Sequence, residues 1–375
     1  MHTNEYLFPH RLTRRDFVQA AGAATASLAA GLTLPGCATA KATTPPVRIG
    51  SSYHTYEVVE GWGRLPEGMK YGFGCGVVVD GQDRVYVTSR STNPCVAVFS
   101  RRGKLLETWS EDFASKVSLT TAQVKDTAHC IYWSKEGPEE YFYWTENSAT
   151  TKEQPAGVGR RVYKTDLKGK ILYEIGNVAK PGSTSQKFEW TNPTDVAVAP
   201  NGDIYVVDGY GSQRVSRFDK NFKPLRTIGS RGKQHGQFNT CHGIWIKTIK
   251  GREPEVYIAD RHNDRIEIFS LELDYKRTLQ GDVRNPCCFY QHKDHLYIPD
   301  LAARVTIIDP DDKLAAHLGD GKDPETKKDK PDNRTNPALF AAPHAMCVDS
   351  HGDFYVVEWV DFGRPRKFKH TPHPA

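Results

Sequence analysis

The sequence predicts an all-β, six-bladed β-propeller, and three observations lead to this fold class. One phrase recurs six times from residue 70 onward, and it consists of a β-rich strand, a glycine-containing turn, a second strand, a polar turn and a third strand. The clearest copy, residues 192–219, contains the hairpin signal Asn201-Gly202, in which we expect both residues to adopt positive φ angles. Repeats of about 40 to 50 residues that each form a small antiparallel sheet are typical of propellers.

The remaining copies follow in chain order and use the whole chain after residue 70. They are residues 77–81 with 84–88, 141–145 with 161–166, 256–260 with 265–269, 295–300 with 305–309, and 348–357. Because the last copy has no fourth strand, we expect residues 56–60 to supply it and to close the ring, which removes an open sheet edge. The composition, with 38% hydrophobic residues, 31 Gly and only 3 Met, is that of a globular rather than a helical or disordered chain.

The first forty residues predict an export signal rather than a folded element. Arg14-Arg15 precedes an Ala-rich apolar run of 17 residues, 18–34, which is typical of a twin-arginine signal. Two processing sites compete, since residues 34–37 resemble a lipoprotein box ending at Cys37, while 38–40 fit the small-x-small rule of ordinary signal peptidase. We therefore expect a periplasmic or cell-envelope protein with a signal in 1–40, an N-terminal segment in 41–69 that carries the closing strand, and a propeller in 70–375.

The charge of the chain bears on nucleic-acid binding, and its cysteine content bears on the expected state of the thiols. The net charge of +5 arises from 50 basic and 45 acidic residues without a basic stripe, which argues against nucleic-acid binding. Membrane association is expected only through a lipid on Cys37 or an uncleaved signal, and we expect a monomer. Seven cysteines follow Cys37, an odd number without a Cys-x-x-Cys pair, so buried free thiols are expected for most of them.

Three histidines recur at equivalent positions of alternate repeats. When the repeats are aligned on their turns, the inner-strand positions are Gly74, His129, Thr194, His242, Cys287 and His344. Alternate blades of a six-bladed ring lie about 120° apart, so the three imidazoles should converge in the central channel. Three His ligands with an open position form a catalytic zinc site, although imidazole also suits copper, iron or nickel. The alternative is that the histidines are satisfied by hydrogen bonds in a polar channel.

Three further residues follow the second strand of their repeats, where we expect the mouth of the channel. They are Arg90, Tyr210 and Arg261. A tyrosine beside a divalent metal has a lowered pKa and can act as a base, while arginine holds an anionic group through two parallel hydrogen bonds. The alternative is that these side chains form turns and salt bridges between blades.

Two pairs of segments resemble the peptidyl-α-hydroxyglycine α-amidating lyase branch of the NHL-repeat propellers. They are residues 192–198 with 208–214, and 238–243 with 259–265, and the resemblance covers roughly residues 70–360. That family cleaves peptidyl-α-hydroxyglycine to the peptide amide and glyoxylate. The resemblance implies zinc on His129, His242 and His344, Tyr210 as the base, and Arg90 and Arg261 as the residues that position the substrate carboxylate. It also implies a calcium ion facing the backbone carbonyls of Val77 and Ile131.

The sequence departs from the family where calcium is concerned. The family motif Pro-His-Asp is Pro343-His344-Ala345 here, so the carboxylate expected on calcium is missing, and Ala342 replaces a methionine. The leading interpretation is an exported, metal-dependent lyase whose substrate is a small molecule or peptide with a carboxylate. Two alternatives stay open. One is a non-enzymatic NHL-type binding or scaffold propeller, and the other is a calcium-dependent lactonase- or esterase-like hydrolase, for which Asp195 is one nearby acid.

Overall fold

The computed structural model describes residues 45–148, 158–176, 185–188, 190–321 and 333–371. The chain separates into two units, Met1–Pro45 and Pro46–Ala375, and everything described below concerns the second. The export signal and processing sites predicted for residues 1–40 lie outside the described residues. Within the described ranges, no helix combines the length and the apolar character that crossing a membrane requires.

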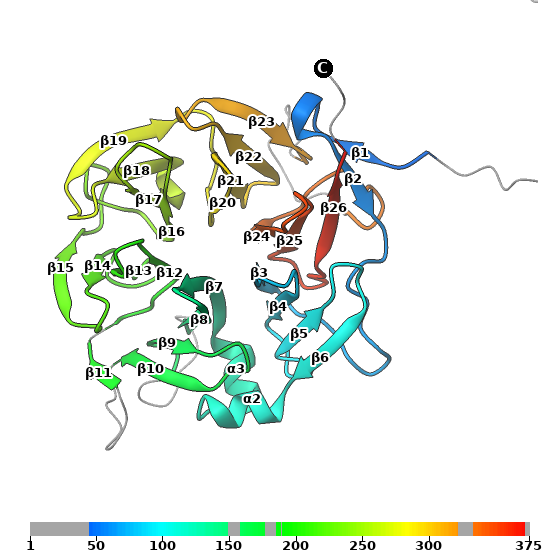
Figure 1. Cartoon of the computed structure of the whole chain (residues 1–375), viewed down its shortest axis with the longest axis horizontal. Helices are drawn as coiled ribbons and strands as arrows, with labels where there is room; N and C mark the ends of the chain where they lie inside the picture. Colours follow the sequence, from blue (N-terminus) through cyan, green and yellow to red (C-terminus); the bar gives the residue numbers. More distant parts are fainter. Residues whose placement is uncertain (1–44, 149–157, 177–184, 189, 322–332, 372–375) are drawn as a thin grey trace, which may run out of the picture. The chain divides into compact units, whose positions relative to one another are not determined.

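Six sheets are arranged in a ring within Pro46–Ala375, which confirms the predicted six-bladed all-β propeller (Figure 1). We number the blades in chain order. Blade 1 comprises β3 (Gly74–Val79), β4 (Val85–Ser89), β5 (Val96–Phe99) and β6 (Leu105–Trp109). Blade 2 comprises β7 (Ala128–Glu136), β8 (Glu139–Glu146), β9 (Arg161–Thr165), β10 (Ile171–Gly176) and β11 (Ser185–Lys187). Blade 3 comprises β12 (Asp195–Val198), β13 (Ile204–Val207), β14 (Val215–Phe218) and β15 (Pro224–Ile228).

The second half of the ring follows the same plan. Blade 4 comprises β16 (Cys241–Lys247), β17 (Glu255–Asp260), β18 (Arg265–Phe269) and β19 (Tyr275–Gln280), with the short 3₁₀ helix η2 (Arg261–Asn263) after β17. Blade 5 comprises β20 (Tyr290–His292), β21 (His295–Asp300), β22 (Arg304–Ile308) and β23 (Leu314–Leu318). Blade 6 contains β24 (Pro343–Val348), β25 (Phe354–Glu358) and β26 (Arg366–His370).

The two outer strands of blade 6 come from the part of the chain that precedes blade 1 in sequence. β2 (Tyr56–Val59) pairs antiparallel with β26, with Tyr56 opposite His370, and β1 (Arg48–Ile49) pairs with β2 on the outside. The 3₁₀ helix η1 (Ser52–His54) joins these two strands. The last blade is therefore one sheet in the order β1-β2-β26-β25-β24, and β26 has a hydrogen-bonded neighbour on both sides.

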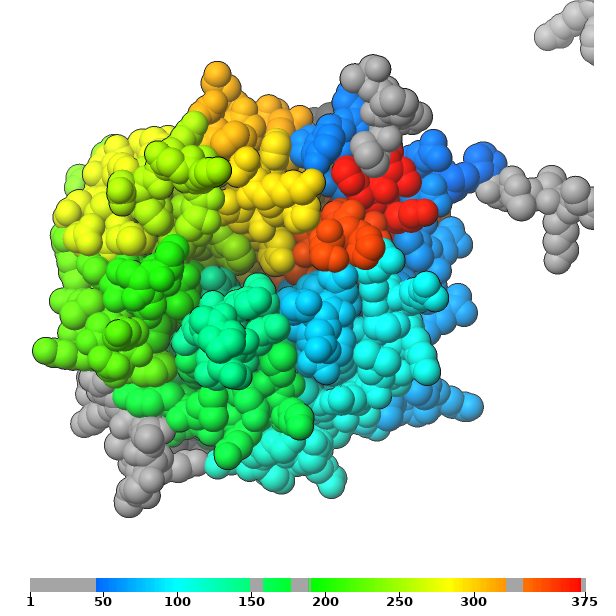
Figure 2. Space-filling model, viewed as in Figure 1, coloured from blue at the N-terminus to red at the C-terminus, as the bar shows by residue number. Residues whose placement is uncertain are grey.

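In blades 1, 3, 4 and 5 the outer strand is more exposed than the second strand. The second strands β4, β17, β21 and β25 are buried along almost their whole length, whereas β15, an outer strand, is exposed at four of its five residues. These second strands are buried on both faces, so their sequences are mostly apolar throughout instead of alternating. One core cluster joins Tyr205 and Val207 of blade 3 to Ile244 and Ile258 of blade 4. In the space-filling view, side chains of neighbouring blades meet around the ring (Figure 2).

Two local expectations differ from the structure. Only Gly202 of the Asn201-Gly202 turn has a positive φ, +90°, so the expectation of two positive φ angles was wrong. The Gly202 N–H donates to the Ala199 carbonyl, and the residues form a longer turn that closes with a left-handed glycine. The repeat pattern also gave no sign of α2 (Glu111–Lys116) and α3 (Thr121–Thr127), which lead into β7 and contain a capping box between Thr120 and Gln123.

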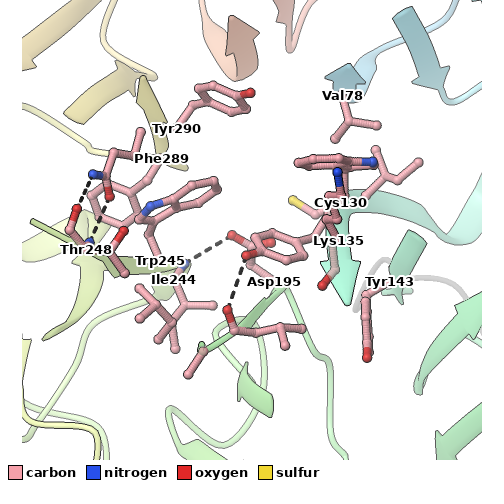
Figure 3. Close-up of a pocket in the computed structure, with 18 of the residues that line it drawn as sticks. Val78, Cys130, Lys135, Tyr143, Asp195, Ile244, Trp245, Thr248, Phe289 and Tyr290 are labelled. Atoms are coloured by element: carbon pink, nitrogen blue, oxygen red, sulfur yellow. Dashed lines mark hydrogen bonds between the residues drawn. The ribbon is translucent and has the colours of Figure 1, made fainter. Parts of the chain in front are cut away.

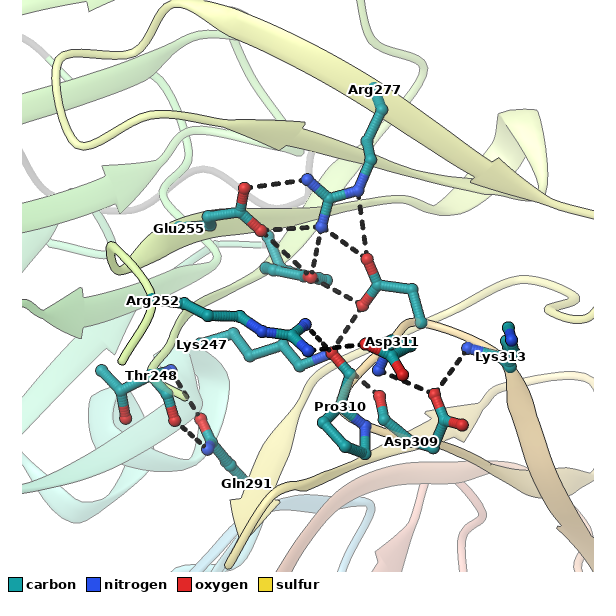
Figure 4. A network of polar contacts seen from close by, with 12 residues as sticks. Lys247, Thr248, Arg252, Glu255, Arg277, Gln291, Asp309, Pro310, Asp311 and Lys313 are labelled. Atoms are coloured by element: carbon teal, nitrogen blue, oxygen red, sulfur yellow. Dashed lines mark hydrogen bonds and ion pairs between the residues drawn. The ribbon is translucent and has the colours of Figure 1, made fainter. Parts of the chain in front are cut away.

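A network of charged side chains joins blades 4 and 5 away from the channel (Figure 4). Lys247, which is 3% exposed, donates to a carboxylate oxygen of Asp312 at 2.6 Å. Arg277 donates to both oxygens of Glu255, at 2.8 and 2.7 Å, which is the paired geometry that arginine and carboxylate favour. Because the ammonium of Lys247 and the carboxylate of Asp312 are both buried, this pair holds the β22–β23 turn of blade 5 against blade 4.

Replacing Tyr56 with Ala should destabilise the fold by about 3–5 kcal/mol, the usual cost of truncating a buried aromatic side chain. Tyr56 is 1% exposed, and its hydroxyl lies 2.9 Å from that of Tyr297 in blade 5, so it ties β2 to the neighbouring blade. Urea unfolding measures the change. The control is Leu225→Ala on exposed β15, which should stay within about 0.5 kcal/mol of the parent. Equal stabilities of the two variants would contradict this role of β2.

Candidate metal centre in the propeller channel

The three histidines predicted from alternate repeats meet in the channel. His129 on β7, His242 on β16 and His344 on β24 are 2%, 0% and 1% exposed. Their ring centroids lie 4.9 Å apart for His129 and His242, and 5.1 Å apart for each of the other two pairs. One ligand atom from each ring lies within 4.8 Å of the other two. The repeat alignment therefore placed these three residues together correctly.

Each of these imidazoles is fixed by a backbone carbonyl of the next blade. His129 Nδ1 lies 2.6 Å from the Thr194 carbonyl oxygen, and His242 Nδ1 lies 2.8 Å from that of Cys287. His344 Nδ1 lies 2.7 Å from the Cys75 carbonyl oxygen. A carbonyl can only accept, so Nδ1 carries the proton in every ring and Nε2 keeps its lone pair. The acceptors belong to blades 3, 5 and 1, so the arrangement alternates around the ring.

The free nitrogens are suited to a metal ion. Among the described residues, Nε2 of His129 and Nε2 of His344 have no hydrogen-bond partner although both atoms are buried. Burial holds the pKa of His129 and of His242 well below the usual range of histidine, and the neighbouring imidazoles and arginines add to this effect. Neutral imidazoles that donate Nδ1–H to a carbonyl and direct Nε2 to a common point are the usual form of a histidine metal site. The three residues therefore fit a zinc-like ion.

Tyr210 lies beside this group, as the sequence predicted. Its hydroxyl oxygen is 3.0 Å from His242 Nε2, and its ring centroid is 5.4 Å from that of His129. Since the Nε2 atom of His242 lacks a proton, the Tyr210 hydroxyl donates in this contact. Burial raises the pKa of Tyr210 to about 12, although the charge of Arg261 opposes the rise. In the metal-free protein, Tyr210 is thus a neutral phenol, and its expected lowered pKa depends on a bound cation.

The two predicted arginines lie at the same end of the channel. Arg261, in η2 and 6% exposed, donates to the Tyr210 hydroxyl at 3.1 Å. Arg90 donates to the Asp126 carbonyl at 2.9 Å and to the Asn147 side-chain oxygen at 2.6 Å. The Nε atoms of both arginines are buried without a hydrogen-bond partner within the described ranges. Each guanidinium group therefore keeps one buried donor without a partner in the described part of the chain.

Sequence reasoning missed two residues of this rim, Asn147 and Trp359. The Trp359 ring lies 5.2 Å from the His344 ring, and the Arg90 guanidinium lies 5.2 Å from the centre of the Trp359 ring. Both missed residues come directly after the second strand of their blades, as Arg90 and Arg261 do. Reading that one position in every repeat would have found them.

A cavity of about 700 Å³ occupies the other end of the channel. The turns that join first to second strands, such as the one at Gly202, contribute to its lining, whereas the rim residues follow the second strands, so the two regions lie at opposite ends. Figure 3 shows Cys130 and Asp195 near its centre, with Trp245 and Tyr290 on one side and Val78 opposite. Burial raises the pKa of Asp195 to about 7, and its two oxygens accept the N–H groups of Val196 and Ile244.

The residues of this cavity do not fit the calcium ion that the family resemblance implies. Val77, Ile131 and Ala345 all line it, so the three positions do come together. The third carries only a methyl group, and Asp195 already uses both oxygens for backbone N–H groups. Calcium takes six to eight oxygen ligands, usually including carboxylates. We therefore assign no role to calcium in this chain.

The chain is similar in sequence to several known proteins, and its fold is similar to that of solved propeller structures. A family model for the NHL repeat matches residues 191–218, the third blade. NHL repeat-containing protein 3 of Homo sapiens is 27% identical over 220 residues, covering 58% of this chain and 57% of that protein. A probable peptidyl-alpha-hydroxyglycine alpha-amidating lyase of Caenorhabditis elegans is 34% identical over 116 residues, covering 30% of this chain and 32% of that protein.

These matches show which proteins the chain resembles. The chain is a six-bladed β-propeller with one segment that matches the NHL repeat, and it is similar in sequence to amidating lyases as well as to NHL repeat-containing proteins. It spans about half the length of the first curated relatives that it matches. A solved structure of streptogramin B lyase aligns with a TM-score of 0.54 at 13% identity, covering 86% of this chain and all of that one, and supports the propeller fold alone.

The protein purified without a polyhistidine tag should bind about one zinc ion per chain, and His242→Ala should remove it, because the variant leaves two of the three imidazoles. Elemental analysis after dialysis against zinc measures the content. His351→Ala is the control, since His351 is 56% exposed and outside the channel. Equal zinc contents of the two variants would show that the three histidines are not the site.

Proposed function

We propose that this protein is an exported, metal-dependent carbon–nitrogen lyase that acts on peptidyl-α-hydroxyglycine or a related carbinolamide with a carboxylate. The observation that carries the proposal is the set of three buried imidazoles whose Nδ1 atoms are bound to carbonyls and whose Nε2 atoms face one point. Tyr210 and Arg261 lie directly beside that point. The similarity to amidating lyases supports the same chemistry. The export signal of residues 1–40 is part of the proposal.

His129, His242 and His344 would hold the ion. When bound, a zinc-like ion supplies a Lewis acid that polarises an oxygen of the substrate. The protein supplies a closed environment around it, since all three rings are buried and their orientation is fixed before any ligand enters. This preorganisation removes the need to reorient side chains when charge develops on the substrate.

Tyr210 is placed to move the proton of the reaction. A carbinolamide breaks down when its hydroxyl loses a proton, the C–N bond breaks to give an aldehyde, and the amide nitrogen gains a proton. The Tyr210 oxygen, 3.0 Å from His242 Nε2, lies next to the position where that hydroxyl would be held. Arg261 donates to the same oxygen at 3.1 Å and so favours its deprotonated form. Arg261 alone does not lower the pKa of Tyr210 enough, so a bound cation would have to complete the effect. With such a cation in place, the deprotonated Tyr210 would accept the hydroxyl proton and return it to the leaving nitrogen.

The arginines are placed to bind the carboxylate of the substrate. Arg90 is held by Asp126 and Asn147 and lies over Trp359, which fixes its guanidinium at the rim. A fixed guanidinium binds a carboxylate through charge-assisted hydrogen bonds at a lower entropic cost than a mobile one. We propose that Arg90 and Arg261 together orient the substrate so that its hydroxyl faces Tyr210.

A second candidate function is a non-enzymatic binding propeller. It is favoured by the match to NHL repeat-containing protein 3, which covers 58% of this chain, compared with 30% for the match to the lyase. On this reading, the rim of Arg90, Arg261 and Trp359 would bind an anionic peptide or polymer without changing it. Measured turnover separates the two candidates.

Tyr210→Phe should lower kcat for glyoxylate release from a peptidyl-α-hydroxyglycine by about 100-fold or more, the usual contribution of a positioned proton-transfer group. Zinc content should not change, because the tyrosine is not one of the three imidazoles. Tyr275→Phe is the matched control, since that ring is 40% exposed on β19. A fully active Tyr210→Phe variant would exclude the tyrosine as the base, and a parent protein that binds zinc but releases no glyoxylate would favour the binding propeller.

A further inference from the structure

Two thiols lie together close to one of the three histidines, His344. Cys130 of blade 2 and Cys288, just before β20 of blade 5, are 158 positions apart in sequence, yet their sulfur atoms are separated by 3.7 Å. Both are buried, and both line the inner end of the 700 Å³ cavity. Two thiolates that bind one tetrahedral ion at about 2.3 Å each lie about 3.8 Å apart. The separation of Cys130 and Cys288 is therefore that of two ligands on one metal.

A third donor completes the group. A ring nitrogen of His344 and the sulfur atoms of Cys130 and Cys288 all lie within 4.8 Å of one another. His344 is 1% exposed, its Nδ1 is bound to the Cys75 carbonyl, and its Nε2 has no hydrogen-bond partner among the described residues. Nε2 of His344 is therefore the nitrogen that can bind an ion together with the two thiols. The same atom is the one assigned to the site formed with His129 and His242.

A different set, formed by His242, Cys287 and Cys288, also meets the distance criterion for a metal site. It is less suitable, because the His242 nitrogen nearer to the Cys287 sulfur is Nδ1, at 3.4 Å, and this nitrogen is bound to the Cys287 carbonyl. Cys287 is also missing from the residues that line the cavity, whereas Cys130 and Cys288 both line it. The group of Cys130, Cys288 and His344 therefore has both a free nitrogen and an approach from the cavity.

The two donor sets differ in chemical preference. Thiolates favour soft cations such as Cu(I) more strongly than imidazoles do, whereas zinc suits both kinds of ligand. An imidazole nitrogen has one lone pair, so His344 can bind an ion in only one of the two sets at a time. Entry also differs, since the thiols face the cavity and the three histidines lie towards the rim of Arg90, Tyr210 and Arg261.

We propose that Cys130, Cys288 and His344 form a second metal site, for a soft cation, that competes with the three-histidine site for His344. Binding of a divalent soft cation displaces the two thiol protons and forms two metal–sulfur bonds. The three-histidine site then keeps two ligands and loses its ion. The proposal does not depend on which reaction, if any, the three-histidine site performs.

Cd²⁺ titration of the metal-free, reduced protein tests the proposal, because cadmium–thiolate bonds absorb in the ultraviolet. The parent protein should develop this absorption up to one Cd²⁺ per chain. The double variant Cys130→Ser/Cys288→Ser should lose affinity by more than the roughly 100-fold that removal of an outer partner costs. Cys95→Ser and Cys287→Ser are the matched controls and should behave like the parent, since Cys95 is buried outside the channel.

Binding of Co²⁺ and Cd²⁺ to histidine variants distinguishes this second metal site from the three-histidine site. The His129→Ala variant should keep the Cd²⁺ absorption, while the double cysteine variant should lose it and keep the visible spectrum of Co²⁺ bound by imidazoles alone. His344→Ala should lose both, and Cd²⁺ should displace Co²⁺ from the parent. The proposal is overturned if the double cysteine variant keeps parental Cd²⁺ affinity, if Cys287→Ser loses it, or if Cd²⁺ and Co²⁺ bind the parent together.

Discussion

The candidate site depends on three hydrogen bonds between imidazole Nδ1 atoms and backbone carbonyls of neighbouring blades. Each bond fixes the tautomer and the rotation of one ring, so that Nε2 of each ring is left for a ligand. In the metal-free protein the Nε2 atom of His242 accepts the hydrogen bond of Tyr210. The bonds to the carbonyls are available because the inner strands of neighbouring blades approach closely at the channel. A loss of register in a blade that provides a carbonyl would misplace a histidine in the preceding blade. The metal centre is therefore a property of the whole ring and not of three isolated residues.

The same geometry explains why the two ends of the channel differ. At one end, the residues after the second strands bring Tyr210, Arg90 and Arg261 around the imidazoles, and they supply a phenol and two guanidinium groups. At the other end, the hairpin turns surround a cavity with aromatic walls, two thiols and one buried carboxylate, Asp195. His344 lies between the two regions and can serve ligands at either. Under the two proposals, the channel would bind one ion through the three imidazoles or one soft ion through the thiols, but not both at once.

The repeat allowed much of this to be predicted from the sequence. Equivalent positions in a repeat become equivalent positions in space, so His129, His242 and His344 could be placed together without knowing any contact between them. The carbonyl partners could not be predicted, because the choice of Thr194, Cys287 and Cys75 depends on how neighbouring blades are staggered. The helices α2 and α3 were missed because they lie between repeats, where periodicity carries no information. Trp359 and Asn147 were missed although their repeat position was available.

X-ray absorption at the zinc edge of the protein loaded with one zinc ion tests the central claim most directly, because it reports the atoms bound to the ion. The account predicts three imidazole nitrogens at about 2.0–2.1 Å, one further light atom and no sulfur. Sulfur neighbours at about 2.3 Å would show that zinc prefers the thiols of Cys130 and Cys288. That result would contradict the assignment of the three-histidine group as the resting metal site.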